Sequence, residues 1–165
     1  MNFITQARCM ICDNTFEGES FAYVCPDHGY DGILDIQYDY DRIAATITPA
    51  TLAENPDPTI WRYKPLLPVY SESAVPPLTV GGTPLYALGS LADDLGVSAF
   101  YLKDDGRLPT ASFKDRASAL AVVKAQEKQA GIITTASTGN AAAALSGLCA
   151  SVGMPNIIFV PASAP

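Results

Sequence analysis

The sequence contains little histidine and few basic residues. One histidine, His28, stands among 165 residues, and ten Lys+Arg oppose 17 Asp+Glu, which gives a net charge of −7. That balance would repel a nucleic-acid phosphate backbone, so we expect no nucleic-acid partner. A single histidine, close to the N-terminus and far from the other candidate catalytic residues, also argues against Ser-His-Asp and Cys-His nucleophile mechanisms.

Long apolar runs and nucleotide-binding motifs are also missing. Ala141–Met154 is the longest stretch of small apolar residues, and it falls short of the roughly 20 residues of a membrane span. The first ten residues, MNFITQARCM, have neither the basic head nor the apolar core of a signal peptide. No G-x-x-x-x-G-K-[ST] or G-x-G-x-x-G motif occurs, so nucleotide binding has no support. We therefore expect a cytoplasmic protein without a membrane segment.

The chain is 48% apolar, which suffices for a buried core. Its composition divides it into three zones. Residues 1–41 hold three of the four cysteines and the histidine, and end in an alternating pattern from Leu34 to Asp41 that predicts a strand. Residues 42–80 are rich in proline, which excludes a long helix or a central strand. We expect an extended segment there that wraps over a core, anchored by Trp61, Tyr63 and Leu66.

Residues 81–165 have the periodicity of an α/β fold. Strands are predicted at 99–102, 132–135 and 157–160. Helices are predicted from Ser112 to about Ala130, stopped by Gly131, and from Ser137 or Thr138 to about Val152. The order β-α-β-α-β predicts a parallel sheet with right-handed crossovers.

Lys114 is the first candidate for chemistry. It falls in the first turn of its predicted helix, where the helix dipole disfavours a cation by ~0.3–1 kcal/mol and favours the neutral amine that attacks carbonyls. Ser137-Thr138-Gly139-Asn140 opens the next helix, where backbone N–H groups and hydroxyls bind a carboxylate or phosphate. Both follow strands, at the edge where open α/β sheets bind ligands. Separately, each feature also fits an ordinary surface lysine and an ordinary helix cap.

Four ordered motifs resemble those of threonine synthases, which are pyridoxal-phosphate enzymes of the tryptophan-synthase-β-like fold. The run from Lys103 to Arg116, KDDGRLPTASFKDR, resembles their active-site lysine segment, apart from Leu108, where relatives commonly carry Asn. Gly81–Leu85 resembles the turn that opens their catalytic core. Ser137–Asn140 resembles their substrate-carboxylate loop, and Cys9–Asp41 their cysteine-containing start.

The resemblance implies a role for each of these residues. Lys114 would form a Schiff base with the aldehyde of pyridoxal 5'-phosphate and then shuttle protons. Asn140 would bind the ring hydroxyl of the cofactor, and the substrate α-carboxylate would be held by Ser137, Thr138 and Gly139. Asp104, Asp105 and Arg107 are expected to shape the loop before the lysine, and the roles of Phe113 and Arg116 stay open.

The implied reaction converts O-phosphohomoserine, a small amino-acid phosphate, and water to threonine and phosphate, in a lyase that forms homodimers. Cysteate synthase and threonine/serine dehydratase share the fold and are alternatives. The glycine-rich cradle for the cofactor phosphate and the hydroxyl facing the pyridine nitrogen do not precede Pro165. We therefore expect the amino-terminal part of a longer enzyme, or a truncated product, with little or no activity by itself.

Cys9-x-x-Cys12 and Cys25-x-x-His28 have the spacing of two metal-ligand pairs. Three cysteines and a histidine form an allowed structural zinc set, so the start of the chain resembles a zinc ribbon. Free thiols, or a redox pair with His28 in a turn, remain alternatives. A further alternative is a non-catalytic zinc-ribbon interaction module. Cys149, within the small-residue helix, is expected to be a buried small hydrophobe.

Overall fold

The structure is a computed structural model that describes residues 3–17 and 23–164. The chain forms two compact units. One comprises the residues up to Pro56 together with Arg62–Ser71, and the other comprises Asp57–Trp61 together with the residues from Glu72 onward.

The first unit contains a four-stranded antiparallel sheet in the order β2-β1-β4-β3. Its strands are β1 (Ile4–Cys9), β2 (Thr15–Glu17), β3 (Val24–Cys25) and β4 (Gly29–Tyr38). The alternation predicted in the first zone is present at Leu34, Asp35 and Ile36 of β4, where half-buried Leu34 and Ile36 flank exposed Asp35 and Leu34 lies opposite Cys9. The strand ends at Tyr38 because the Asp39 side chain accepts a hydrogen bond from the Arg42 N–H and starts a helix.

Short helices occupy much of the proline-rich zone, which is therefore not extended throughout. They are α1 (Tyr40–Thr46), α2 (Pro49–Glu54) and the 3-10 helix η1 (Ile60–Leu66). Thr48 caps α2, and Pro49 stands at its first position, where the missing N–H costs nothing. Of the expected anchors, Trp61 is buried, whereas Tyr63 is 42% exposed.

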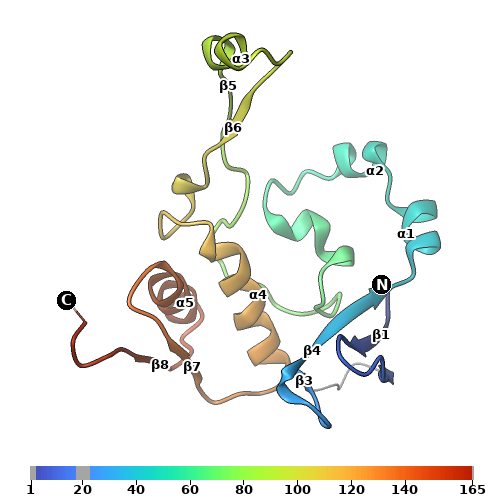
Figure 1. Ribbon diagram of the computed structural model, residues 1–165, viewed down its shortest axis with the longest axis vertical. Coiled ribbons are helices and arrows are strands. Elements are labelled where there is room, and N and C mark those ends of the chain that lie inside the picture. Colours follow the sequence, from blue (N-terminus) through green and yellow to red (C-terminus); the bar gives the residue numbers. More distant parts are fainter. Residues whose placement is uncertain (1–2, 18–22, 165) are drawn as a thin grey trace. The chain divides into compact units, whose positions relative to one another are not determined.

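In the second unit, β5 (Leu85–Ala87) and β6 (Tyr101–Lys103) form an antiparallel pair. The helix α3 (Gly89–Leu95) connects them, and Figure 1 shows it at the end of this hairpin. The prediction that this strand belongs to the parallel sheet is wrong. Gly96, in the left-handed conformation, ends α3 and turns the chain back so that β6 meets its local neighbour β5.

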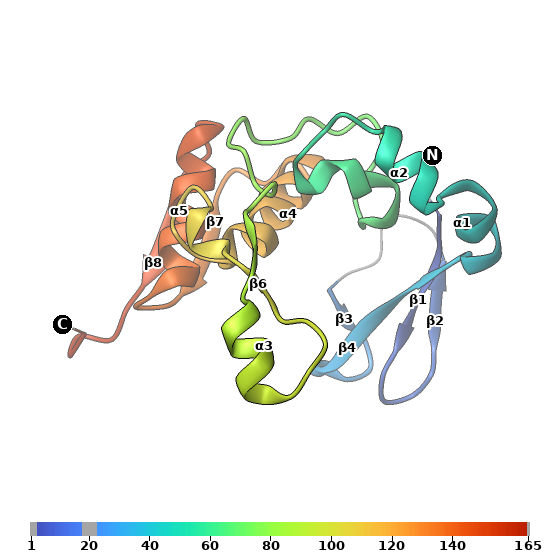
Figure 2. The same cartoon turned by 90° about the horizontal axis from the view of Figure 1, so that it is seen from above.

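The remaining elements confirm the later half of the β-α-β-α-β prediction. They are α4 (Lys114–Glu127), β7 (Ile133–Ala136), α5 (Asn140–Ser151) and β8 (Asn156–Phe159), and the two strands pair in parallel. Figures 1 and 2 show α4 and α5 side by side, and α5 also packs against β8. The buried residues of the two helices are Asp115, Ser118, Ala119, Val122, Val123, Ala144, Leu145, Leu148 and Cys149.

Cys149 is fully buried, as predicted, and burial raises the pKa of its thiol. Across the two described ranges, we find no helix with both the length and the apolar character that crossing a membrane requires.

Candidate functional site

The loop that leads into α4 is fastened to the helix by a buried carboxylate. Asp115 is fully buried, and both the N–H and the hydroxyl of Thr110 donate hydrogen bonds to it, the N–H at 2.8 Å. Between them, Ala111 has a φ of +56°, a left-handed conformation that an L-residue rarely adopts. The loop is thus held in a strained, tightly defined shape directly before Lys114.

Lys114 is the first residue of α4, close to its predicted place. The helix begins two residues after Ser112, the predicted start, and its N-cap is Phe113, which provides no side-chain capping hydrogen bond, so the prediction that Ser112 is the cap is wrong. The Ser112 hydroxyl accepts a local hydrogen bond from the Lys114 N–H at 3.2 Å. The Lys114 Nζ lies 4.3 Å from the centre of the exposed Phe113 ring. The amine thus lies against an aromatic ring at the N-terminal end of α4.

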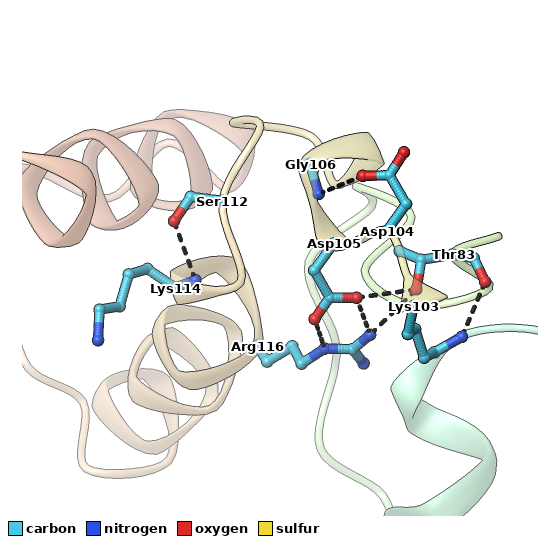
Figure 3. Close-up of polar contacts among 8 residues, drawn as sticks. All are labelled: Thr83, Lys103, Asp104, Asp105, Gly106, Ser112, Lys114 and Arg116. Atoms are coloured by element: carbon cyan, nitrogen blue, oxygen red, sulfur yellow. Dashed lines mark hydrogen bonds and ion pairs between the residues drawn. The ribbon is translucent and has the colours of Figure 1, made fainter. Parts of the chain in front are cut away.

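Arg116 projects from the opposite side of α4 and binds the segment before the helix (Figure 3). Its Nε donates to Asp105 Oδ2 at 2.8 Å and its Nη2 to Asp105 Oδ1 at 2.7 Å. The buried Thr83 hydroxyl donates to the same carboxylate at 2.8 Å, and Lys103 Nζ donates to the Thr83 carbonyl. This cluster joins the Gly81–Leu85 turn, the KDDGR segment and α4.

The charge on Arg116 controls the acidity of Asp105. Hydrogen bonds from Arg116 lower the pKa of Asp105 from 3.8 to about 2, against the opposing effect of partial burial, and the Thr83 hydroxyl adds to the lowering. Asp105 in turn raises the pKa of Arg116. The pair is therefore charged at any physiological pH and acts as a structural clamp rather than as an acid or base.

The Gly81–Leu85 turn needs glycine for a packing reason. Gly81 has a φ of +122°, and a Cβ there would lie 2.7 Å from the Ile60 backbone N. Gly81 forms an isolated bridge with Thr59, and the Ile60 N–H donates to the Val80 carbonyl at 2.8 Å. The turn that carries Thr83 is thereby anchored on the 57–61 segment.

The Ser137–Asn140 loop follows the carboxyl end of β7, as predicted. The Ser137 N–H donates to the Phe159 carbonyl, and the Ser137 hydroxyl accepts the Gly139 N–H at 3.2 Å. Gly139 is the N-cap of α5, and it provides no side-chain hydrogen bond to the helix. The first N–H groups of α5 thus lack a side-chain cap, and with the positive end of the helix dipole they can bind an anion.

Thr110 connects the lysine segment to α5. Its methyl group lies where a Cβ on Gly147 of α5 would approach it to 2.9 Å. Since Thr110 also binds Asp115 in α4, the loop before Lys114 lies between the two helices. Because Gly147 has no side chain, the loop can pack this closely against α5.

The four predicted metal ligands meet in the first unit. Ligand atoms of Cys9, Cys12, Cys25 and His28 all lie within 4.8 Å of one another. Backbone N–H groups of Cys12 and Ile11 lower the pKa of Cys9 from 9.0 to about 7, against desolvation. The pKa of Cys12 is raised, because burial and the neighbouring thiols outweigh the Asn14 N–H that lowers it.

Sequence reasoning missed the cluster of Thr83, Asp105 and Arg116. Asp105 shapes its loop, as expected. Its partner Arg116 lies 11 residues further along the chain, on α4, so the two are not spaced three or four residues apart as neighbours on one helix would be. Arg107, by comparison, pairs locally with Asp104 at 3.2 Å. The only signal for the cluster in the sequence was that the Gly81–Leu85 and KDDGR motifs precede Lys114 in order along the chain.

The chain is similar in sequence to a family of known enzymes. A family model described as "Pyridoxal-phosphate dependent enzyme" matches residues 77–165. The chain is 36% identical to a threonine synthase of Methanocaldococcus jannaschii over 154 residues, 93% of this chain and 37% of that protein. It is 37% identical to a threonine synthase of Methanosarcina acetivorans over 157 residues, 94% of this chain and 36% of that protein.

A relative with another name is also similar. The chain is 32% identical to a cysteate synthase of Methanosphaerula palustris over 166 residues, 96% of this chain and 36% of that protein. The chain thus spans little more than a third of the length of these curated relatives. The similarity to the threonine synthases covers their amino-terminal portion.

Proposed function

Because the chain belongs to the family of pyridoxal-phosphate dependent enzymes, we propose that it carries the cofactor lysine and the substrate-carboxylate loop of a threonine synthase. The reaction would convert O-phosphohomoserine and water to threonine and phosphate. The observation that carries the proposal is the pairing of two features on packed helices: an amine in the first turn of α4, and an α5 N-terminus without a side-chain cap.

The residues fit the cofactor by their chemistry. An aldehyde is bound by a primary amine, and in the part of the chain that the structure describes, the Lys114 Nζ makes no ion pair or hydrogen bond. The side-chain amide of Asn140 can donate a hydrogen bond to a ring hydroxyl. When bound, pyridoxal phosphate supplies an electron sink that stabilises negative charge on the substrate carbon.

Lys114 would act in two ways. Its Nζ would hold the aldehyde until the substrate amine takes its place, and would then accept and return protons as a general base and acid. The clamp between Asp105 and Arg116, two residues further along the helix, would fix the turn from which that amine extends. The neighbouring Phe113 ring would cover one side of the amine.

The loop at the start of α5 would orient the substrate. The N–H groups of Gly139 and of the first helical turn, with the hydroxyls of Ser137 and Thr138, would bind the α-carboxylate. An anion at this end of a helix gains about 0.3–1 kcal/mol from the dipole, besides its hydrogen bonds. Binding the carboxylate there would hold the substrate amine in a fixed direction.

Cysteate synthase is the second candidate, and the similarity over 96% of the chain favours it over other reactions of the fold. Both candidates use the same lysine and carboxylate loop in our proposal, so substrate competition has to separate them.

Covalent trapping tests the proposal. The chain is incubated with pyridoxal phosphate and reduced with borohydride, and the modified lysine is located by mass spectrometry of its peptides. We expect the adduct on Lys114, lost in Lys114→Ala and kept in Lys128→Ala, a matched control just beyond the other end of α4. Labelling spread evenly over the lysines would refute the cofactor role and favour a non-catalytic interaction module.

The substrate is tested in the same assay. O-phospho-L-homoserine should reduce labelling of Lys114 more than its D-enantiomer does, because only one enantiomer presents both its carboxylate and its amine correctly. Selective labelling without this difference would leave the cofactor proposal standing and overturn the threonine synthase reaction.

A further inference from the structure

Three thiols and one imidazole converge in the first unit, apart from any residue proposed to bind cofactor or substrate. The Cys9 Sγ lies 3.9 Å from the His28 Nδ1, and the Cys12 Sγ lies 3.9 Å from the Cys25 Sγ. Each short distance joins one member of the first pair to one member of the second. The two pairs therefore face each other and enclose one point.

The spacing of these atoms matches a tetrahedral ion and not a disulfide. Bonds of about 2.3 Å to sulfur and about 2.0–2.1 Å to nitrogen place the ligands of a tetrahedral zinc roughly 3.5–3.8 Å apart. The observed separations are 3.9 Å for the two contacts and at most 4.8 Å for all of them. All four cysteines are free, and a disulfide would need its sulfurs about 2.05 Å apart.

We infer that Cys9, Cys12, Cys25 and His28 form a structural zinc site. Thiolates with an imidazole favour zinc over magnesium or calcium, which prefer oxygen. Four protein ligands complete the tetrahedron and leave no position for water or substrate, so the ion would be structural and not catalytic.

The backbone of both pairs is shaped in the same way. The residue directly after each pair has a left-handed conformation, with φ of +58° at Asp13 and +53° at Gly29. In the first pair, the Ile11 N–H points at the Cys9 Sγ at 3.4 Å, a contact that stabilises a thiolate. These two turns direct both side chains of each pair to the same side.

Gly32 and a hydrogen bond between Asn14 and Asp27 pack around the cluster. A Cβ on Gly32 would lie 2.7 Å from the Cβ atoms of both Cys25 and His28, so only glycine leaves those ligands in place. The Asn14 Nδ2 donates to the Asp27 Oδ2 at 3.1 Å and joins the loop of one pair to the loop of the other. The cluster is thus a built site rather than a chance approach of exposed thiols.

The first unit has reason to need such a crosslink. Its buried hydrophobic residues among those that the structure describes are Phe3, Ala7, Cys9, Cys25 and Val69. Two of the five are themselves ligands, so the apolar core is small. Binding of a structural metal contributes directly to folding in domains of this kind.

Metal analysis of the purified chain tests the site. The chain is expressed with zinc, purified without chelators or a metal-affinity column, and analysed for zinc and for free thiols. We expect one zinc per chain in the wild type and in Cys149→Ser, which removes the one cysteine outside the cluster. Cys9→Ser and Cys25→Ser should lose the metal, whereas His28→Cys should keep it, since four thiolates also bind zinc.

Cobalt and Gly32→Ala keep the test decisive if a ligand variant fails to fold. Cobalt added to the metal-free wild type should give the visible absorption of tetrahedral thiolate coordination, displaced by zinc. Gly32→Ala keeps all four ligands and should still weaken zinc binding. A reduced wild-type chain that takes up no zinc would overturn the proposal. So would equal metal loss in Cys149→Ser and Cys9→Ser, or a disulfide between cluster cysteines in protein purified with zinc under reducing conditions.

Discussion

Arg116 holds the carboxylate of Asp105 with two parallel hydrogen bonds, at 2.8 Å and 2.7 Å, although 11 residues separate them. The Thr83 hydroxyl donates to the same carboxylate from a third segment. The helix that begins at Lys114 is therefore tied to both of the motifs that precede it. Since paired hydrogen bonds fix direction as well as distance, the first turn of α4 has a defined orientation in this unit.

The clamp should contribute measurably to stability. We expect Asp105→Asn and Arg116→Gln to be non-additive, with a coupling free energy of about 1 kcal/mol, because the pair is bidentate and partly buried. Urea unfolding of the two single variants and the double variant measures this coupling. The pair Asp104–Arg107, in which the arginine side chain is 69% exposed, is the matched control and should couple by less than about 0.5 kcal/mol. Equal coupling in both pairs would contradict the prediction.

The same carboxylate should make stability depend on pH in acid. The folded-state pKa of Asp105 is about 2, below its ordinary value of 3.8, so the unfolded chain binds its proton first as the pH falls. The stabilisation is present in full above the ordinary value and is lost as the pH falls through about 2. The difference in unfolding free energy between wild type and Asp105→Asn should shrink over that window. A difference that stays constant would show that the charge of Asp105 does not matter.

Ala111→Gly should stabilise the protein. The φ of +56° at Ala111 costs an L-residue about 1–2 kcal/mol, and glycine adopts it freely, at the expense of about 0.4–1 kcal/mol of additional unfolded-state entropy. We expect a net gain of about 0.5 kcal/mol in thermal or urea unfolding. Ala117→Gly, an exposed position inside α4, should instead lose about 1 kcal/mol. The same sign in both variants would argue against strain at position 111.

Gly81→Ala should be strongly destabilising, by about 3 kcal/mol, because its Cβ would meet backbone atoms of Thr59 and Ile60 that cannot move aside. Gly89→Ala is the control, since no atom lies within 4 Å of its Cβ position. That variant should change the unfolding free energy by less than about 1 kcal/mol. Similar unfolding midpoints for the two variants would contradict the packing argument.

Gly139→Asp should separate helix stability from anion binding. A Cβ at Gly139 meets no atom within 4 Å, and an aspartate there would cap α5 and stabilise the fold by about 1 kcal/mol. Its carboxylate would at the same time occupy the N–H groups that we propose for the substrate. Amide resonances of Asn140 and Ala141 should shift when O-phosphohomoserine is added to the wild type and not to the variant. Equal shifts in both proteins would exclude this helix end as the anion site.

The sequence allowed the elements around α5 to be predicted because their signals are local. Ile133–Ala136 and Asn156–Phe159 are short β-branched or apolar runs, and Gly153 and Pro155 mark the end of the helix between them. The convergence of Cys9, Cys12, Cys25 and His28 was equally readable, since two-residue gaps bring side chains together in a turn. The bound zinc remains a prediction.

Other features could not be predicted in this way because they depend on pairing across the chain. β6 was assigned to the parallel sheet, but three residues carry too little pattern to show that Leu85–Ala87 is their partner. Thr48-Pro49, by contrast, is a recognisable helix start, and the α2 helix was overlooked because proline was read only as a breaker. The pairing of Arg116 with Asp105 could not be predicted either, because the two residues are not three or four positions apart on one helix.

The contact between Thr110 and Gly147 makes the two halves of the proposed active site mechanically dependent on each other. A shift of α5 along its axis would carry Gly147 with it and would change the position available to the Thr110 side chain. Since Thr110 is hydrogen-bonded to Asp115, such a change would be felt one residue from Lys114. A carboxylate that draws on the beginning of α5 would therefore also reposition the amine.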